Sequence, residues 1–187
     1  RLPNETASNV VSGTQGSSFQ GWSLAIGDFN ADGIGDFATG LFGHDAVGAP
    51  NAGAVRLFRG RAATQGGPVA LPLIEFNQGD TRFGASVALG DLNSDGFSDL
   101  LVGAPFYSNG QTEEGAAMIF FSNAGSFNAT PSVILQSNVA GARAGTSVAV
   151  AGDINGDGNV DILVGAPNVS GGLGNQGAVT LSGNGRY

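Results

Sequence analysis

Apolar residues in this chain occur in short runs separated by turns rich in glycine, asparagine and proline. In the middle of the chain the runs are "FGASVALG" (83–90), "DLLVG" (99–103), "GAAMIFF" (115–121) and "SVIL" (132–135). None has the 3.6-residue spacing of an amphipathic helix, and their lengths suit strands. The pattern therefore predicts an all-β protein of antiparallel strands.

The same order of runs occurs earlier and later in the chain. The earlier counterparts are "GWSLAIG", "DFATG", "GAVRLF" and "PLIEF", and the later ones are "GTSVAVAG", "DILVG" and "GAVTL". The equivalent aspartates Asp28, Asp91 and Asp153 are 63 and 62 residues apart. A fixed period of this length indicates a repeat architecture. We therefore expect one unit, residues 1–187, with approximate repeats 19–82, 83–143 and 144–187, the last together with 1–18.

Four antiparallel strands repeated in this way are typical of a β-propeller blade, which predicts three blades per chain. The third repeat has no fourth apolar run. However, "ETASNVVSG" precedes the first repeat, and Val10 lies nine residues before Phe19, as Ile74 lies nine before Phe83. We expect residues 5–12 to be the outer strand of a blade that begins at the other end of a chain, which protects a sheet edge.

Three blades are fewer than the roughly four to eight from which propellers close. The sequence therefore predicts a homo-oligomer, a dimer whose two chains complete a six-bladed ring by a heterologous contact. The alternative is that the chain is a fragment of a longer propeller, for example a seven-bladed one.

Three turns contain nine of the 15 acidic residues, and each reads D-x-N-x-D-G-x-x-D. Oxygen side chains at positions 1, 3, 5 and 9 suit Ca²⁺, which accepts six to eight oxygens. Carboxylates about 4 Å apart repel by roughly 1 to 4 kcal/mol per pair, so we expect one Ca²⁺ per loop and three per chain. The predicted ligands are the side chains of Asp28, Asn30, Asp32, Asp36, Asp91, Asn93, Asp95, Asp99, Asp153, Asn155, Asp157 and Asp161, with the backbone carbonyls of Ile34, Phe97 and Asn159.

An EF-hand is excluded, because its bidentate Glu at position 12 is replaced by Thr39, Val102 and Val164. Solvated Asx turns are the other alternative. Three copies at a fixed period argue against that alternative.

The stretch "FGASVALGDLNSDGFSDLLVGAP" with the following "GAAMIF" resembles the FG-GAP repeat of integrin α-subunit propellers and of related bacterial and fungal propellers, including some lectins. The resemblance implies that the acidic loops join the first and second strands of each blade, and that partners bind the opposite face. The first repeat departs from the pattern, because it has Gln20-Gly21 and "GLF" where the second has Phe83-Gly84 and "GAP". The third has Ala144-Gly145 and one extra residue before Asp153.

Composition limits the classes of partner. The net charge is −8 and the pI is about 4.2, and the chain has no Lys. This charge balance argues against binding to the phosphates of a nucleic acid. The chain has no Cys either. No apolar stretch reaches the roughly 18 to 20 residues that cross a bilayer, so we expect no membrane insertion. Sequons at Asn4, Asn128 and Asn168 are compatible with an extracellular or cell-surface protein.

The sequence offers little for catalysis. It has one histidine, His44, which we expect in a solvent-exposed turn rather than in an acid/base pair, and we expect Trp22 in the core. These features predict a protein that is not an enzyme. A calcium-dependent, lyase-like polysaccharide-degrading enzyme is the alternative, because some such enzymes resemble this fold.

The expected function is a calcium-stabilised binding or adhesion module for a carbohydrate or protein ligand. Its candidate contact loops join the second and third strands, at residues 44–51, 106–114 and 168–176. Phe106 and Tyr107 are expected to offer a stacking surface there.

Overall fold

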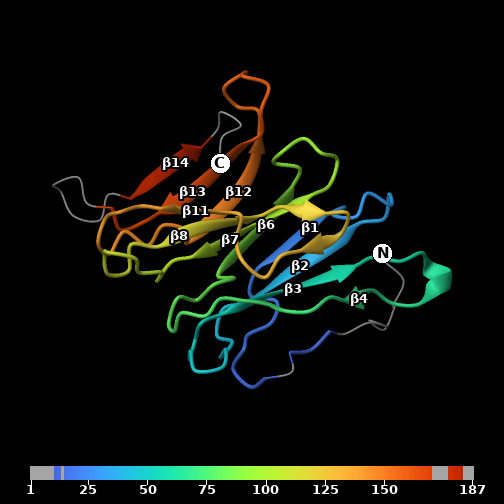
Figure 1. Ribbon diagram of the computed structural model, residues 1–187, viewed down its shortest axis with the longest axis horizontal. Coiled ribbons are helices and arrows are strands. Elements are labelled where there is room, and N and C mark those ends of the chain that lie inside the picture. The colour runs from blue at the N-terminus through green and yellow to red at the C-terminus, as the bar shows by residue number, and fades with distance from the viewer. Residues whose placement is uncertain (1–10, 14, 170–176, 183–187) are drawn as a thin grey trace, which may run out of the picture.

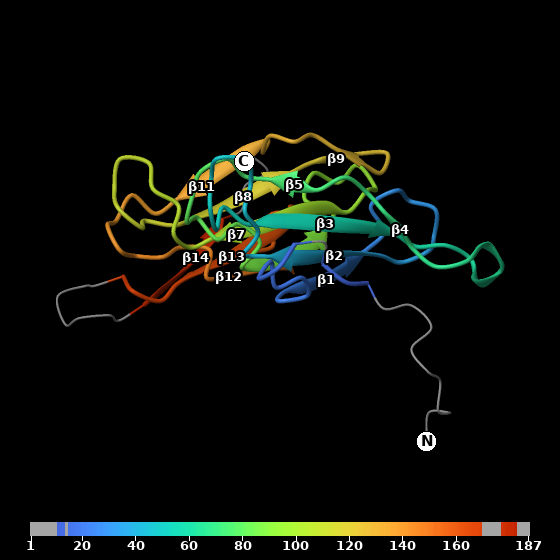
Figure 2. The ribbon, with the colours of Figure 1, turned by 90° about the horizontal axis from the view of Figure 1, so that it is seen from below.

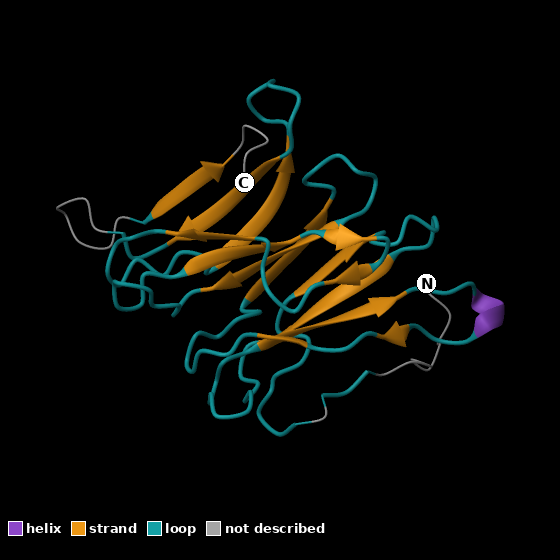
Figure 3. Ribbon diagram, viewed as in Figure 1, coloured by secondary structure: helices purple, strands orange, loops and turns teal. Residues whose placement is uncertain are grey.

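The computed structural model describes residues 11–13, 15–169 and 177–182. Over these residues almost all regular structure is antiparallel β-strand, with one short 3-10 turn, η1 (Ala63–Gln65) (Figure 3). The predicted all-β class is confirmed.

The strands form three main sheets. The first contains β1 (Leu24–Gly27), β2 (Asp36–Leu41), β3 (Ala54–Arg59), β4 (Val69–Ala70) and β5 (Ile74–Glu75), with β4 and β5 both paired to β3. The second contains β6 (Ser86–Gly90), β7 (Asp99–Ala104), β8 (Ala116–Phe120) and β11 (Val133–Gln136). The third contains β12 (Ser147–Gly152), β13 (Asp161–Ala166) and β14 (Ala178–Ser182). A small ribbon of β9 (Ser122–Asn123) and β10 (Ser126–Phe127) follows β8.

The predicted order of strands holds in each repeat. The first three strands form an antiparallel meander, and in the first two repeats a fourth strand, β5 or β11, pairs with the third. In the third repeat a bulge between Val150 and Gly152 accommodates the extra residue seen in the sequence.

The three sheets stack face to face, with β6 packed between β1 and β12 (Figures 1 and 2). One apolar cluster, which includes Val55, Phe83 and Met118, lies between the first and second sheets. Another, which includes Leu101 and Ile162, lies between the second and third. Every residue of β7 and β8 is buried, because the second sheet is covered on both faces. This explains why these strands read as continuous apolar runs.

The described residues form an open stack of antiparallel sheets, which is consistent with a propeller-like fold but is not a closed ring (Figure 1). The outer strand predicted over residues 5–12 lies outside the described residues, except for Val11 and Ser12, which are not in a strand.

The expectation that Trp22 belongs to the core is wrong. Its side chain is 63% exposed, and its ring, which precedes β1, packs on the ring of Phe42 with centroids 4.5 Å apart. The expectation of a solvent-exposed His44 is also wrong. That side chain is buried, because its loop folds back against β5 and its Nε2 lies 2.7 Å from Glu75 Oε1.

Candidate metal centres and the opposite loop face

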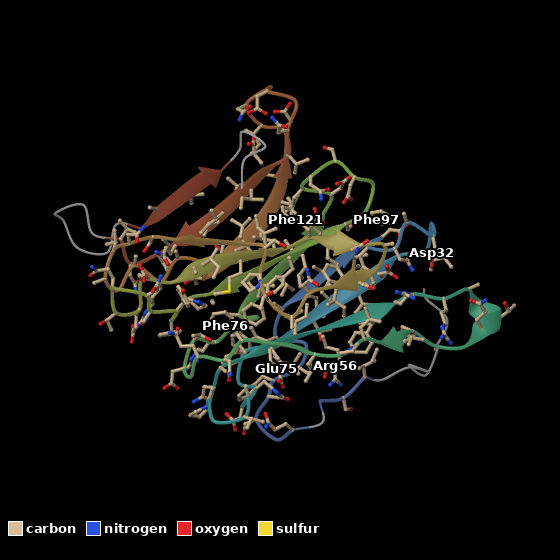
Figure 4. The ribbon with its side chains drawn as sticks, viewed as in Figure 1. Asp32, Arg56, Glu75, Phe76, Phe97 and Phe121 are labelled. Carbon is tan, nitrogen blue, oxygen red and sulfur yellow. The ribbon has the colours of Figure 1, made fainter. Side chains whose placement is uncertain are left out.

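The three acidic loops, residues 28–36, 91–99 and 153–161, connect the first and second strands of their sheets. They emerge at the same end of the stack (Figure 1), and Asp32 and Phe97 mark two of them in Figure 4. Because neighbouring strands are antiparallel, the loops between second and third strands emerge at the other end. The structure thus has an acidic-loop end and a second loop face, as the resemblance implied.

The last aspartate of each acidic loop is fully buried at the start of a second strand. Asp36 accepts hydrogen bonds from the backbone N–H of Phe29 (3.0 Å) and of Gly60 (2.7 Å), which directly follows β3. Asp99 accepts hydrogen bonds from the backbone N–H of Leu92 (2.9 Å) and of Ser122 (2.8 Å), which lies just beyond β8. Each of these carboxylates therefore ties its loop to the third strand.

Burial changes the acidity of these two groups. Burial raises the pKa of Asp36, and it raises the pKa of Asp99 to about 6. The hydrogen bonds from backbone N–H groups oppose this effect, and the neighbouring loop carboxylates add to it. The negative charge of Asp99 is thus costly in the folded protein when no cation is close by.

The first aspartate of each loop organises the turn. Its Oδ2 accepts the N–H of the residue five positions later, at 2.8 Å for Asp28 and 2.9 Å for Asp91 and Asp153. The asparagine at position 3 accepts the N–H of the aspartate at position 5, at 3.1, 3.0 and 2.8 Å in the successive loops. The three loops therefore share one backbone arrangement.

The middle aspartates, Asp32, Asp95 and Asp157, are exposed at the loop tips. Each Oδ1 accepts the N–H of the residue at position 7, at 2.8 to 2.9 Å. These residues are Ile34, Phe97 and Asn159, whose carbonyls are the predicted backbone ligands. At Asp157 the hydrogen bonds from Asn159 lower the pKa of the carboxyl.

Within the described ranges, no three Asp, Glu or His side chains converge as they would around a metal ion. The carboxylates point instead at backbone N–H groups of their own loops and, for Asp36 and Asp99, also at an N–H group near the end of the third strand. The donor set still fits a hard cation, since each carboxylate has about four acceptor positions and Asp28 uses two of them. All the predicted side-chain donors are oxygens, as Ca²⁺ requires.

The second loop face carries a feature that sequence reasoning missed. We call Phe42, Arg82, Phe106 and Arg143 the cation–aromatic row. The Arg82 guanidinium lies 5.5 Å from the Phe42 ring and 5.0 Å from the Phe106 ring, and that of Arg143 lies 4.6 Å from Phe106. Arg143 also pairs with Glu113 at 2.8 Å. The sequence feature that could have revealed this row is the arginine that directly precedes Phe83 and Ala144, at equivalent positions of two repeats.

The predicted stacking pair on this face is only partly present. Tyr107 is buried and packs edge-on against Phe76, with centroids 5.8 Å apart, so it belongs to the core. Phe106 is half-buried and belongs to the cation–aromatic row. Of the three predicted contact loops, residues 170–176 lie outside the described residues.

The described part of the chain has no helix long and apolar enough to cross a membrane.

Comparison with known proteins identifies the repeats. The family model described as FG-GAP repeat matches residues 83–120 and 144–182. Integrin alpha-3 of Mus musculus is 36% identical over 157 residues, which cover 82% of this chain and 14% of that protein. Integrin alpha-5 of Xenopus laevis is 34% identical over 170 residues, covering 88% of this chain and 15% of that protein.

The chain is also similar to a protein that is not an integrin subunit. Phosphatidylinositol-glycan-specific phospholipase D of Homo sapiens is 33% identical over 168 residues, covering 85% of this chain and 20% of that protein. The chain therefore spans a fifth or less of these relatives.

Proposed function

Because the chain contains FG-GAP repeats and belongs with the integrin-like proteins that carry them, we propose that it is a calcium-stabilised propeller module that binds a ligand in adhesion. The observation that carries this proposal is the acidic loop, present three times with one hydrogen-bond arrangement. In each copy the last aspartate is fully buried and fixed by backbone N–H groups.

Each acidic loop would hold one Ca²⁺, three per chain, through its three aspartates, its asparagine and the carbonyl at position 7. The cation supplies positive charge and no chemistry of its own. It would offset the repulsion between loop carboxylates and the burial cost of Asp99, and so favour the folded chain by mass action.

The cation–aromatic row supports a ligand that carries carboxylate groups. Arg82 and Arg143 both stack on Phe106, so their guanidinium groups occupy the ring that a sugar would otherwise use. Guanidinium groups bind carboxylates by paired hydrogen bonds, and stacking on aromatic rings pre-organises them. We therefore favour an acidic peptide or an acidic glycan over a neutral sugar.

We propose binding rather than catalysis. The one histidine, His44, is buried, and its contact with Glu75 holds a loop against β5. A group with that placement suits a structural role better than proton transfer to a substrate. An extracellular or cell-surface location suits a ligand-binding module of this kind and is part of the proposal.

The test is an array of acidic peptides, acidic glycans and neutral glycans, probed with the protein in Ca²⁺ and in chelator. Binding should be confined to carboxylate-bearing probes and should be lost in chelator. Arg82→Ala should weaken it by about tenfold, the loss of one charge-assisted hydrogen bond, whereas Arg61→Ala at an exposed site should not. Binding to neutral glycans alone, or equal binding by the Arg82 variant, would contradict the proposal. The class of acidic probe that binds distinguishes a lectin from a protein-binding module.

A further inference from the structure

The two contacts between neighbouring sheets can be compared residue by residue, because the same backbone hydrogen bonds occur in both. The N–H of Phe83 donates to the carbonyl of Ala52 at 3.0 Å, and the N–H of Ala144 donates to the carbonyl of Glu114 at 3.1 Å. Each also forms a parallel bridge to the glycine that follows that carbonyl. Phe83, at the contact of the first and second sheets, is therefore equivalent to Ala144, at the contact of the second and third.

Two further pairs of residues are equivalent in the same way. The N–H of Tyr107 donates to the last residue of β7 at 3.1 Å, and the N–H of Val169 donates to the last residue of β13 at 3.4 Å. Phe76 and Ser137 each directly follow the fourth strand of their sheet, β5 or β11. Each contact thus has three matched positions, which carry rings in one case and small side chains in the other.

Aromatic rings fill the contact between the first and second sheets. Phe76 stacks on Phe83 with ring centroids 5.7 Å apart, and it meets Tyr107 edge-on at 5.8 Å. Phe83 and Tyr107 are buried in the apolar cluster between these sheets, and Phe76 packs against that cluster. Three rings therefore occupy the space that these positions enclose.

The contact between the second and third sheets has a pocket in the same place. Its three equivalent residues, Ser137, Ala144 and Val169, have no ring, and all three line a pocket of about 590 Å³. Leu135 of β11 also lines it and is half-buried, whereas its equivalent Ile74 of β5 is buried. The pocket is therefore the space that three rings occupy in the other contact.

The wall of the pocket is mostly apolar, and none of the described residues that line it is charged. Its three polar residues already have partners. Gln136 donates to Asn138 at 3.1 Å, and the hydroxyl of Ser137 donates to the carbonyl of Glu114 at 2.7 Å. An apolar cavity of this kind holds water poorly and binds apolar molecules.

A fourth strand beside β14 would not fill this space with rings. The contact between the first and second sheets has a fourth strand on both sides, β5 and β11, but its three rings belong to residues that lie between strands. The equivalent residues of the second contact all lie in the described part of the chain. The pocket therefore follows from the side chains at three positions of this sequence.

We propose that this pocket binds a small, neutral aromatic molecule. The other contact of the same chain shows that aromatic rings fit between two such sheets, and the lack of charge on the wall favours a neutral ligand. The volume is within the roughly 300 to 1,000 Å³ that is typical of sites for small molecules. This site goes beyond the proposed adhesion function and does not rest on the cation sites or on a carboxylate-bearing ligand.

The experiment is a fluorescence titration of the full chain in Ca²⁺ with N-phenylnaphthylamine, a neutral probe that brightens in apolar sites. Wild type should bind it saturably, with a dissociation constant below about 100 μM. Ala144→Phe and Val169→Tyr restore rings of the other contact, and each should weaken binding by at least ~10-fold. Val47→Phe adds a ring at a position that is 97% exposed, so this matched control should bind as wild type does.

Thermal unfolding of the same proteins separates filling of the pocket from damage to the fold. Each ring-restoring variant should unfold roughly 2 to 4 °C above wild type, because it fills an apolar cavity. Midpoints below that of wild type in both variants would show that the chain already fills the space. That result, no saturable binding to wild type, unchanged binding by both variants, or lost binding in the control would overturn the proposal. Tighter binding of acetyl-phenylalanine amide than of the probe would assign the pocket to a peptide side chain instead.

Discussion

The buried carboxylate of Asp99 accepts the backbone N–H of Ser122 at 2.8 Å, which links an acidic loop to the end of the third strand of its sheet. The other oxygen of Asp99 accepts the N–H of Leu92 at 2.9 Å. This residue therefore serves the fold directly as well as the proposed cation site, and the two roles can be separated by substitution.

Asp99→Asn should destabilise the protein even in chelator. The amide keeps one acceptor oxygen but turns an NH₂ donor toward a backbone N–H, so one buried hydrogen bond is lost. We expect a cost of about 2 kcal/mol in the free energy of unfolding, measured by urea denaturation. A variant as stable as wild type would show that these two hydrogen bonds contribute little.

Asp95→Asn is the matched change at an exposed position of the same loop. In chelator it should alter the free energy of unfolding by less than about 0.5 kcal/mol, because the side chain is at the surface. In Ca²⁺ it should lose the stabilisation that its loop gains from the cation. Thermal unfolding in both buffers measures the difference, and an unchanged response to Ca²⁺ would remove Asp95 from the ligand set.

Gly103→Ala tests the packing of the second sheet against the third. A methyl group there overlaps the carbonyl of Gly145, so the second and third sheets must separate. Such overpacking costs about 3 kcal/mol. Gly35→Ala is the control: among the described residues its methyl group would meet only Ile26, at 3.8 Å, so it should leave stability within about 1 kcal/mol of wild type. Equal stability of the two variants would show that the sheets do not pack as described.

The His44 and Glu75 pair should couple the second loop face to the outer strand of the first sheet. A double-mutant cycle with His44→Ala and Glu75→Ala should give a coupling energy of about 1 kcal/mol, because a buried imidazole nitrogen contacts a carboxylate at 2.7 Å. Chemical denaturation of the four proteins gives this energy. Additive effects of the two substitutions would mean that the contact adds nothing to stability.

Local patterns were sufficient to predict the first three strands of each repeat and the acidic loops, but not the two-residue strands β4, β9 and β10. The run "DLLVG" and its counterparts show their strand character directly, and the acidic loops repeat at a fixed period. The fourth strands were also predicted, from the runs "PLIEF" and "SVIL", which contain β5 and most of β11.

Contacts between distant residues could not be predicted in this way. Trp22 is of a residue type that usually lies in a core, but here its ring packs on Phe42 in a loop and is 63% exposed. Ile26 is also of such a type, and it is 79% exposed because no described sheet covers its side of the first sheet. His44 is buried by β5, which lies some thirty residues later. Arg82 and Arg143 form a row with Phe106 only because the sheets stack. The sequence supplies each partner, and the stacking brings the partners together.

The central claim is that each acidic loop binds Ca²⁺, and isothermal titration of the chelator-treated protein with CaCl₂ tests it most directly. Heat that saturates at three Ca²⁺ per chain, and at two for the Asp95→Asn variant, is the predicted result. No saturable heat with the folded wild type, or saturation unaffected by the substitution, would contradict it.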